Sequence, residues 1–215
     1  MWNIMKKNMN FFVIYFVITT SLIGLLRIVT GRNLSVVFVI IGGILVFLLV
    51  FGSTLTNEQY EEKNKGYRFL DTLPVSAREI AEAKFSLVLV AVGLCVGFLL
   101  ILITLSEGAP EAIVLARSYV LFIGVICLIL SGVNYIGIFA LGFTKYLIVI
   151  GVGWLSLGFV PMIVMKTFEG RMDILRDRIL NFYAGIDWVM GVPLSLVIYF
   201  LLMLVAGKVL HAKST

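Results

Sequence analysis

Charged side chains are scarce in this 215-residue chain, where they make up only 13% of the residues, against about 25% in soluble domains. Because 61% of the residues are apolar or aromatic, the chain cannot cover a globule with polar side chains. This composition excludes a soluble globular domain, and it equally excludes a disordered, collagen-like or coiled-coil chain. We therefore expect an all-α polytopic membrane protein.

Histidine and cysteine are nearly absent. The one histidine, His211, lies in the C-terminal tail, so the membrane-spanning part has no imidazole to act as a general base and the chain has no HExxH zinc motif. Cys95 and Cys127 lie in apolar runs, where a thiol packs as a small hydrophobe, and two isolated thiols make neither a disulfide framework nor a zinc site. We expect no metal and no bound cofactor.

A GxxxxGK[ST] loop is also missing, so we expect the chain not to be an enzyme and not to hydrolyse ATP itself. The formal charge of +5 is small for this length and gives no reason to expect a nucleic-acid partner.

Six hydrophobic runs predict six transmembrane helices in one domain that covers residues 1–215. Lys6 and Lys7 precede the first run, and no small-residue cleavage site follows it, so we expect a retained signal anchor. The fourth run is long enough to tilt or break near Ser131 and Gly132. The predicted spans are 11–29, 34–52, 85–105, 112–142, 146–165 and 188–207.

The distribution of basic residues predicts the orientation. An even number of spans places both termini on one side of the membrane, and that side has ten of the 17 basic residues whereas the other has seven. Since cytoplasmic loops carry the excess of Lys and Arg, we expect a multi-pass protein of the cell membrane with both termini in the cytoplasm.

Much of the charge lies in a predicted cytoplasmic loop, residues 56–84, between the second and third spans. Thr56 with Gln59 and Ser76 with Glu79 have the spacing of capping boxes, so we expect a helix to begin at each. Pro74 ends the first helix, because the residue before a proline is pushed out of the helical region. The second helix has no breaker and runs straight into the third span.

An acidic cluster lies in the first part of this loop. Glu58, Glu61 and Glu62 are followed by basic residues, and a pair such as Glu61 with Lys65 at i,i+4 is typical of a solvated helix face. We expect this cluster to lie in solvent. The basic residues are Lys63, Lys65 and Arg68.

The centre of the loop, residues 69–75 (FLDTLPV), has four large apolar side chains within an otherwise charged segment. The pattern is compatible with a helix on the membrane surface. It is equally compatible with a short apolar element that docks into a groove on a cytoplasmic partner.

Two further features face the membrane or its outer surface. Residues 166–187 have one apolar helical stripe, which predicts an external amphipathic segment that acts either as a surface anchor or as a lid. Asn134, with Ser131 one turn before it, is the strongly polar side chain remote from any predicted span end. These two residues either line a substrate path or bond to a neighbouring helix.

The layout resembles that of the ABC-2 type permeases: six spans, no ATPase motif, a long charged loop after the second span and an amphipathic segment after the fifth. Within residues 58–85, the run EEKNKGYRFLDTLPVSAREIAEAKF is similar to that family's acidic residues, leucine-bracketed LP step and helix leading into the third span. The size is most similar to small permeases of Gram-positive peptide exporters and bacteriocin-immunity systems, including phenol-soluble modulin exporters.

The resemblance implies a coupling helix that sits in a cleft of a separate nucleotide-binding ATPase subunit, where ATP and Mg bind. It also implies short external helices after the fifth span, a second permease chain in a homodimer or heterodimer, and export of an amphipathic or hydrophobic cargo such as a peptide. The residues that it assigns to ATPase coupling are Tyr67, Arg68, Phe69, Leu70, Asp71, Thr72, Leu73, Pro74, Val75, Ser76, Arg78 and Glu79.

Two other classes compete with this one. A non-transporting membrane scaffold or immunity protein that binds a peptide or lipid would keep the charged loop without nucleotide-dependent movement. An intramembrane enzyme would need a polar catalytic group, and only Asn134 and scattered hydroxyls are available.

Overall fold

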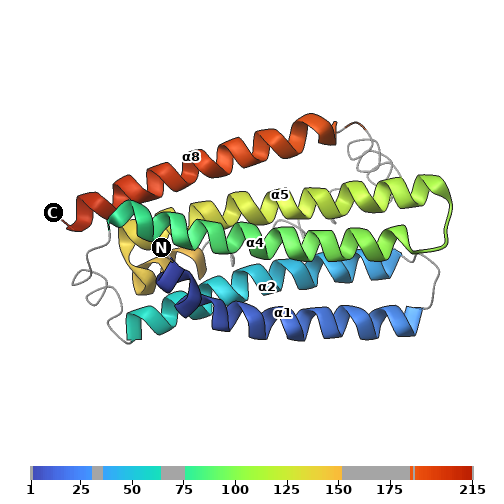
Figure 1. The fold of residues 1–215 in the computed structure, drawn as a ribbon, viewed down its shortest axis with the longest axis horizontal. Coiled ribbons are helices and arrows are strands. Elements are labelled where there is room, and N and C mark those ends of the chain that lie inside the picture. The colour runs from blue at the N-terminus through green and yellow to red at the C-terminus, as the bar shows by residue number, and fades with distance from the viewer. Residues whose placement is uncertain (1, 31–35, 64–75, 152–184, 186, 215) are drawn as a thin grey trace, which may run out of the picture.

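Five long helices lie side by side: α1, α2, α4 and α5 alternate in direction along the chain, and α8 runs in the same direction as α5 (Figure 1). The computed structural model describes residues 2–30, 36–63, 76–151, 185 and 187–214. The described residues form helices and no strand, so the all-α prediction is confirmed for them. The helices are α1 (Trp2–Thr30), α2 (Val36–Lys63), α4 (Ala77–Thr104), α5 (Pro110–Leu141) and α8 (Trp188–Ser214).

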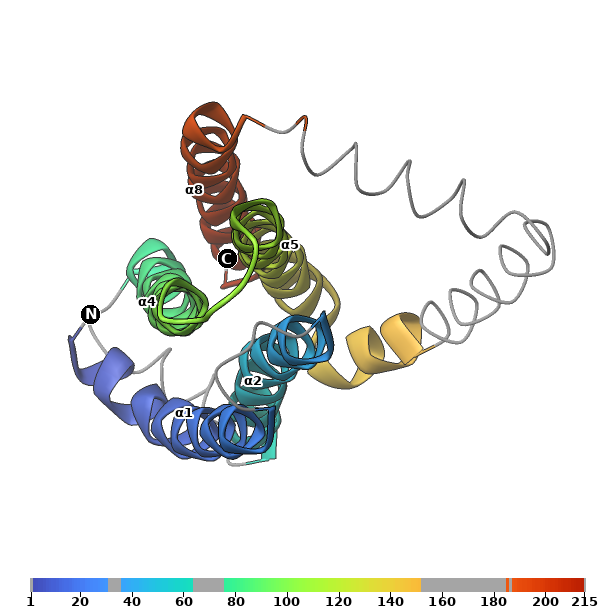
Figure 2. The same cartoon turned by 90° about the vertical axis from the view of Figure 1, so that its right-hand side faces the viewer.

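A further helical stretch, residues 143–151, follows the end of α5. Figure 2 shows that it turns sideways out of the bundle instead of running back along α5. The remainder of the fifth predicted span lies outside the described residues, as does most of the external segment 166–187.

Four helices are long and apolar enough to cross a membrane, and α1 has a shorter apolar stretch from Val13 to Val29. The protein is therefore an integral membrane protein, although the count of six spans stays a prediction. The observed helices extend past several predicted spans because a helix continues into its polar flanks after the apolar run has ended. The four helices are Phe38–Lys63, Ala77–Thr104, Pro110–Leu141 and Trp188–Ala212.

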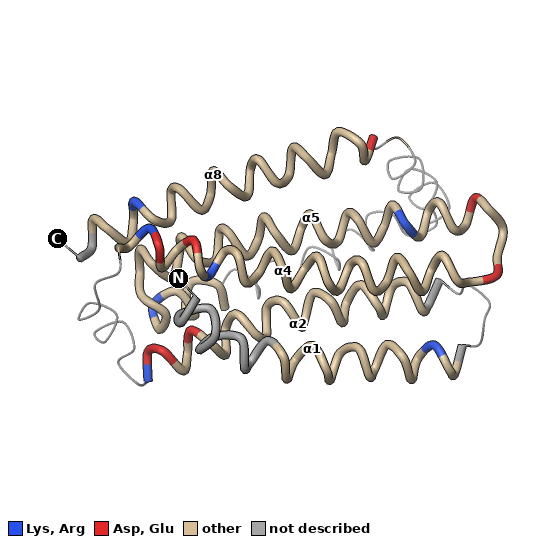
Figure 3. Tube along the Cα trace, in the orientation of Figure 1, with Lys and Arg blue, Asp and Glu red and all other residues tan. Residues whose placement is uncertain are grey.

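The charged residues in the described part of the chain gather at the two ends of the bundle and leave its middle apolar (Figure 3). Both termini lie at the same end as the connection from α2 to α4 (Figure 1), and we call this the terminal end. An apolar middle between two charged ends suits the hydrocarbon core of a bilayer, which is about 30 Å thick.

Helix α4 is the central element, because it packs against α1, α2, α5 and α8. Its inner face is apolar and buried, with Phe85, Val88 and Leu99 among the best buried side chains. Nothing in its 28 residues breaks a helix, so the predicted uninterrupted run from the loop into the third span is confirmed.

The prediction that a helix begins at Thr56 is wrong. Helix α2 passes through this position without interruption to Lys63. The Thr56 hydroxyl does not cap a helix but forms a hydrogen bond of 2.9 Å with the hydroxyl of Tyr15 on α1. The spacing of Thr56 and Gln59 is that of a capping box, but no residue before it stops the preceding helix.

Of the two alternatives for the fourth span, a tilt or a break near Ser131 and Gly132, the break is absent, since α5 is continuous to Leu141. Gly132 instead allows α8 to approach closely: a Cβ atom at this position would lie 2.8 Å from Cδ1 of Leu202. A side chain there would push α8 away, so this glycine serves packing.

Candidate functional site

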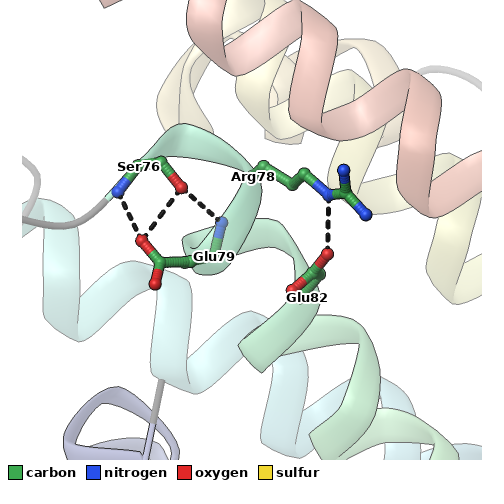
Figure 4. A network of polar contacts seen from close by, with 4 residues as sticks. All are labelled: Ser76, Arg78, Glu79 and Glu82. Atoms are coloured by element: carbon green, nitrogen blue, oxygen red, sulfur yellow. Dashed lines mark hydrogen bonds and ion pairs between the residues drawn. The ribbon is translucent and has the colours of Figure 1, made fainter.

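Helix α4 begins at the terminal end with the predicted capping box (Figure 4). The Ser76 backbone N–H donates to Oε2 of Glu79 at 2.8 Å, and the Glu79 backbone N–H donates to Oγ of Ser76 at 3.2 Å. From the same first turn, Nε of Arg78 donates to Oε1 of Glu82 in the next turn at 2.8 Å. The two bonds between Ser76 and Glu79 satisfy backbone donors that the first turn of a helix otherwise leaves open, and they fix where α4 starts.

Of the residues predicted to couple to an ATPase, the structure describes Ser76, Arg78 and Glu79, and it places all three in this first turn. The others, residues 67–75, lie outside the described residues, so their docking role stays a prediction.

A buried ion cluster joins α4 to α2 two turns after the cap. Nζ of Lys84 donates to Oε1 of Glu58 and, at 2.9 Å, to Oε2 of Glu61. The side chains of Lys84 and Glu58 are 0% exposed and that of Glu61 is 1% exposed. We call these three residues the α2–α4 clamp.

The clamp overturns the expectation that the acidic cluster lies in solvent. Only Glu62 of the three acids is exposed, and its carboxylate accepts a hydrogen bond from Thr144 at 2.9 Å. Buried residues recur every three or four positions along α2. This buried face continues past the apolar run through Ser53, Asn57 and Glu61. This spacing was visible in the sequence. A search for apolar runs misses it, because the run ends before these polar positions.

Two aromatic rings of α5 cover the clamp. Nζ of Lys84 lies 5.9 Å from the ring centroid of Tyr135 and 5.6 Å from that of Phe139. Both distances are within the range of cation–π attraction, which strengthens when water is excluded. The ammonium group of Lys84 is therefore held by carboxylates of α2 and by ring faces of α5.

An aromatic stack continues from the clamp toward α8. The Phe85 ring lies between Tyr135 of α5 and Tyr199 of α8, with centroid distances of 5.4 and 5.0 Å. The Tyr199 hydroxyl donates to the backbone carbonyl of Phe85 at 3.0 Å. Positions 84 and 85 thus connect α4 to three neighbouring helices within one turn.

Breaking such a cluster is costly. Removing one partner of a buried ion pair leaves an uncompensated charge and commonly costs about 3 to 5 kcal/mol. The clamp therefore ties the beginning of α4 to the end of α2.

The two polar residues predicted on the fourth span, Ser131 and Asn134, are both buried in α5. Oδ1 of Asn134 accepts a hydrogen bond from the hydroxyl of Tyr146, in the stretch 143–151. This bond is of the helix-packing kind, one of the two roles that the sequence left open. Within the described part of the chain, Nδ2 of Asn134 and Oγ of Ser131 have no hydrogen-bond partner.

The site offers mechanical connection between helices. Among the described residues, no group of three or more His, Cys, Asp or Glu side chains is placed to hold a metal ion. Its charges and rings instead fix the relative positions of four helices.

Comparison with known proteins assigns the chain to a family. A family model described as "ABC-2 family transporter protein" matches residues 3–210, nearly the whole chain. No curated protein matches the chain, and no solved structure matches it.

Proposed function

We propose that this chain, which belongs to the ABC-2 family of transporter proteins, exports an amphipathic or hydrophobic cargo by using ATP that a separate nucleotide-binding subunit hydrolyses. Its family and its apolar helices together support the role of permease component of an ABC transporter. ATP and Mg bind the partner, and the permease itself is not an enzyme.

One observation supports this proposal most: α4 is an uninterrupted rod that starts at a fixed cap and packs against every other long helix of the bundle. The segment 64–75 joins its start to the end of α2, and the α2–α4 clamp holds these two helix ends together. A displacement of the segment 64–75 by a partner would therefore be transmitted to α2 and α4 as one body, and through α4 to the rest of the bundle.

We place the coupling helix at residues 67–76, with Phe69, Leu70 and Leu73 as the apolar anchors that enter a cleft of the ATPase subunit. Truncation of such an anchor typically costs about 2 kcal/mol or more of binding free energy. The helix cap at Ser76 then marks the point at which the docking element passes into the rod.

The terminal end faces the cytoplasm in this proposal, because it is the side with the larger number of basic residues. Two permease chains and two ATPase chains form the working unit. A peptide is the proposed cargo, since the size of the chain resembles that of the small permeases of peptide exporters.

The experiment that tests the proposal is a pull-down of the solubilised chain from its native membranes, followed by transport and ATPase assays of the reconstituted complex. Leu70→Asp and Leu73→Asp are expected to abolish transport and cargo-stimulated ATP hydrolysis, because a buried carboxylate opposes docking. Leu70→Met and Leu73→Met are the matched controls, and they should retain both activities.

Two outcomes would contradict the proposal. Normal ATPase stimulation in the Asp variants, with normal membrane insertion, would remove the coupling assignment. Recovery of no ATPase in the pull-down would favour a scaffold or immunity protein that binds a peptide or lipid without transporting it.

A further inference from the structure

A continuous apolar groove runs between α4 and α8. Its wider part, of about 440 Å³, lies against Ser86 and Leu89 of α4 and Leu196 and Phe200 of α8. A narrower part of about 160 Å³ also contacts Leu89 and Leu196, continues along α4 to Val96, and is lined on its third side by Leu121 and Leu128 of α5. Because the two parts share lining residues, they form one groove.

Helix α8 leans away from α4 and α5, and side chains of α5 narrow the groove on the diverging side. Figures 1 and 2 agree that these helices are close at the terminal end and diverge toward the opposite end. Gly93 lines the narrower part, and a Cβ atom at this position would have nothing within 4 Å. The groove is therefore open at Gly93, whereas the neighbouring Val92 and Val96 of α4 pack against Gly124 of α5.

The length of the groove is sufficient for one lipid tail. Glu82 and Val96 mark its ends on α4, and at 1.5 Å per residue the groove is about 21 Å long. One leaflet of the hydrocarbon core is about 15 Å deep, half of about 30 Å. The groove is thus long enough to hold an acyl chain over the full depth of its leaflet.

Positive charge lies where the groove closes at the terminal end. A Cβ atom at Gly207 of α8 would lie 3.5 Å from Cα of Arg78, so the helices converge there. Lys208 follows directly and is exposed. Arg78 pairs through Nε with Glu82, an acid that lines the wider part of the groove. The Arg78 side chain nevertheless remains 70% exposed, so its other N–H groups and the ammonium group of Lys208 are accessible to a headgroup.

We propose that this groove binds one anionic glycerophospholipid of the surrounding bilayer, with an acyl chain between α4 and α8 and the phosphate at Arg78 and Lys208. The apolar lining alone does not select a ligand, because bilayer tails are as apolar as leucine. Selection comes from the two cations, since juxtamembrane basic residues attract anionic headgroups. Nothing in this proposal depends on the transported cargo.

The test measures lipid selectivity at the groove with a tryptophan reporter. Leu196→Trp is introduced after the native tryptophans are changed to Phe, and the full chain is reconstituted into bilayers of phosphatidylcholine and brominated phosphatidylglycerol. Quenching against lipid composition gives the relative binding constant of the two lipids at the reporter. Leu94→Trp, an exposed position on α4 that lines neither part of the groove, is the control reporter. The native tryptophans to be replaced are Trp2, Trp154 and Trp188.

Phosphatidylglycerol should be preferred at Leu196→Trp and not at Leu94→Trp. Arg78→Gln and Lys208→Gln should each lower this preference about fivefold, which is the effect of one basic residue near an anionic surface. Gly93→Phe fills the narrow part and should reduce quenching at Leu196→Trp. Gly24→Phe on α1, where a Cβ atom also meets nothing within 4 Å, should leave it unchanged.

Equal binding of both lipids, unaffected by Arg78→Gln and Lys208→Gln, would overturn the proposal. So would a disulfide between two copies through Leu89→Cys, because the groove would then be covered by a second chain. Lys208→Gln is informative by itself, since it removes none of the ion pairs described above.

Discussion

Replacing Lys84 by methionine should both destabilise this protein and uncouple its helices. The substitution keeps the length of the side chain but removes the ammonium group that holds Glu58 and Glu61. Because both carboxylates are buried, the expected loss is the cost of an uncompensated buried charge, about 3 to 5 kcal/mol. For a chain of this size about 1 kcal/mol shifts the melting temperature by about 2 to 4 °C, so Lys84→Met should lower it by about 6 to 20 °C.

The assay is thermal unfolding of the detergent-solubilised protein, followed by size-exclusion chromatography. Lys145→Met is the matched control, because Lys145 is exposed and lies shortly after α5; it should change the melting temperature by less than about 2 °C. The triple variant Lys84→Met, Glu58→Gln, Glu61→Gln should recover most of the loss, because removing all the charges of a buried cluster is often close to neutral.

A melting temperature of Lys84→Met equal to that of Lys145→Met would refute the clamp as a stabilising contact between α2 and α4. If the clamp also transmits movement, the triple variant should fold and insert yet show reduced cargo-stimulated ATP hydrolysis in the reconstituted complex. Full ATPase coupling in a stable triple variant would limit the role of the clamp to stability.

Three smaller changes test the remaining contacts of the site. Gly137→Ala should destabilise the protein, because a Cβ atom there would collide with the Tyr146 ring; Gly24→Ala, with open space at that position, should be neutral or stabilising in the same melting assay. Tyr146→Phe removes the bond to Asn134 and should cost about 0.6 kcal/mol, a shift of about 1 to 2 °C; no shift would show that the ring packing alone holds the stretch 143–151. Ser76→Ala removes the cap of α4 and should cost about 1 kcal/mol, whereas Ser76→Asp should be tolerated; equal melting temperatures for the two would contradict the role of the cap.

The sequence was sufficient to predict the class of the protein and the start of its central helix. Long apolar runs with few charges require a lipid environment, and this requirement does not depend on how the helices are arranged. The capping box at Ser76 is a local motif whose two bonds join residues three positions apart, so it too could be recognised without the fold. The same local reasoning failed at Thr56, whose hydroxyl contacts Tyr15 of another helix.

The pairing of residues in the α2–α4 clamp was decided by the tertiary structure, although the spacing on α2 indicated an inward-facing stripe. Its ion pairs join residues 23 and 26 positions apart, and they form only because α2 and α4 pack antiparallel with these faces together. Glu58 and Glu61 have the same local sequence whether they face solvent or Lys84. Burial of a charge depends on which helix covers it, and that is determined by the packing of the whole bundle.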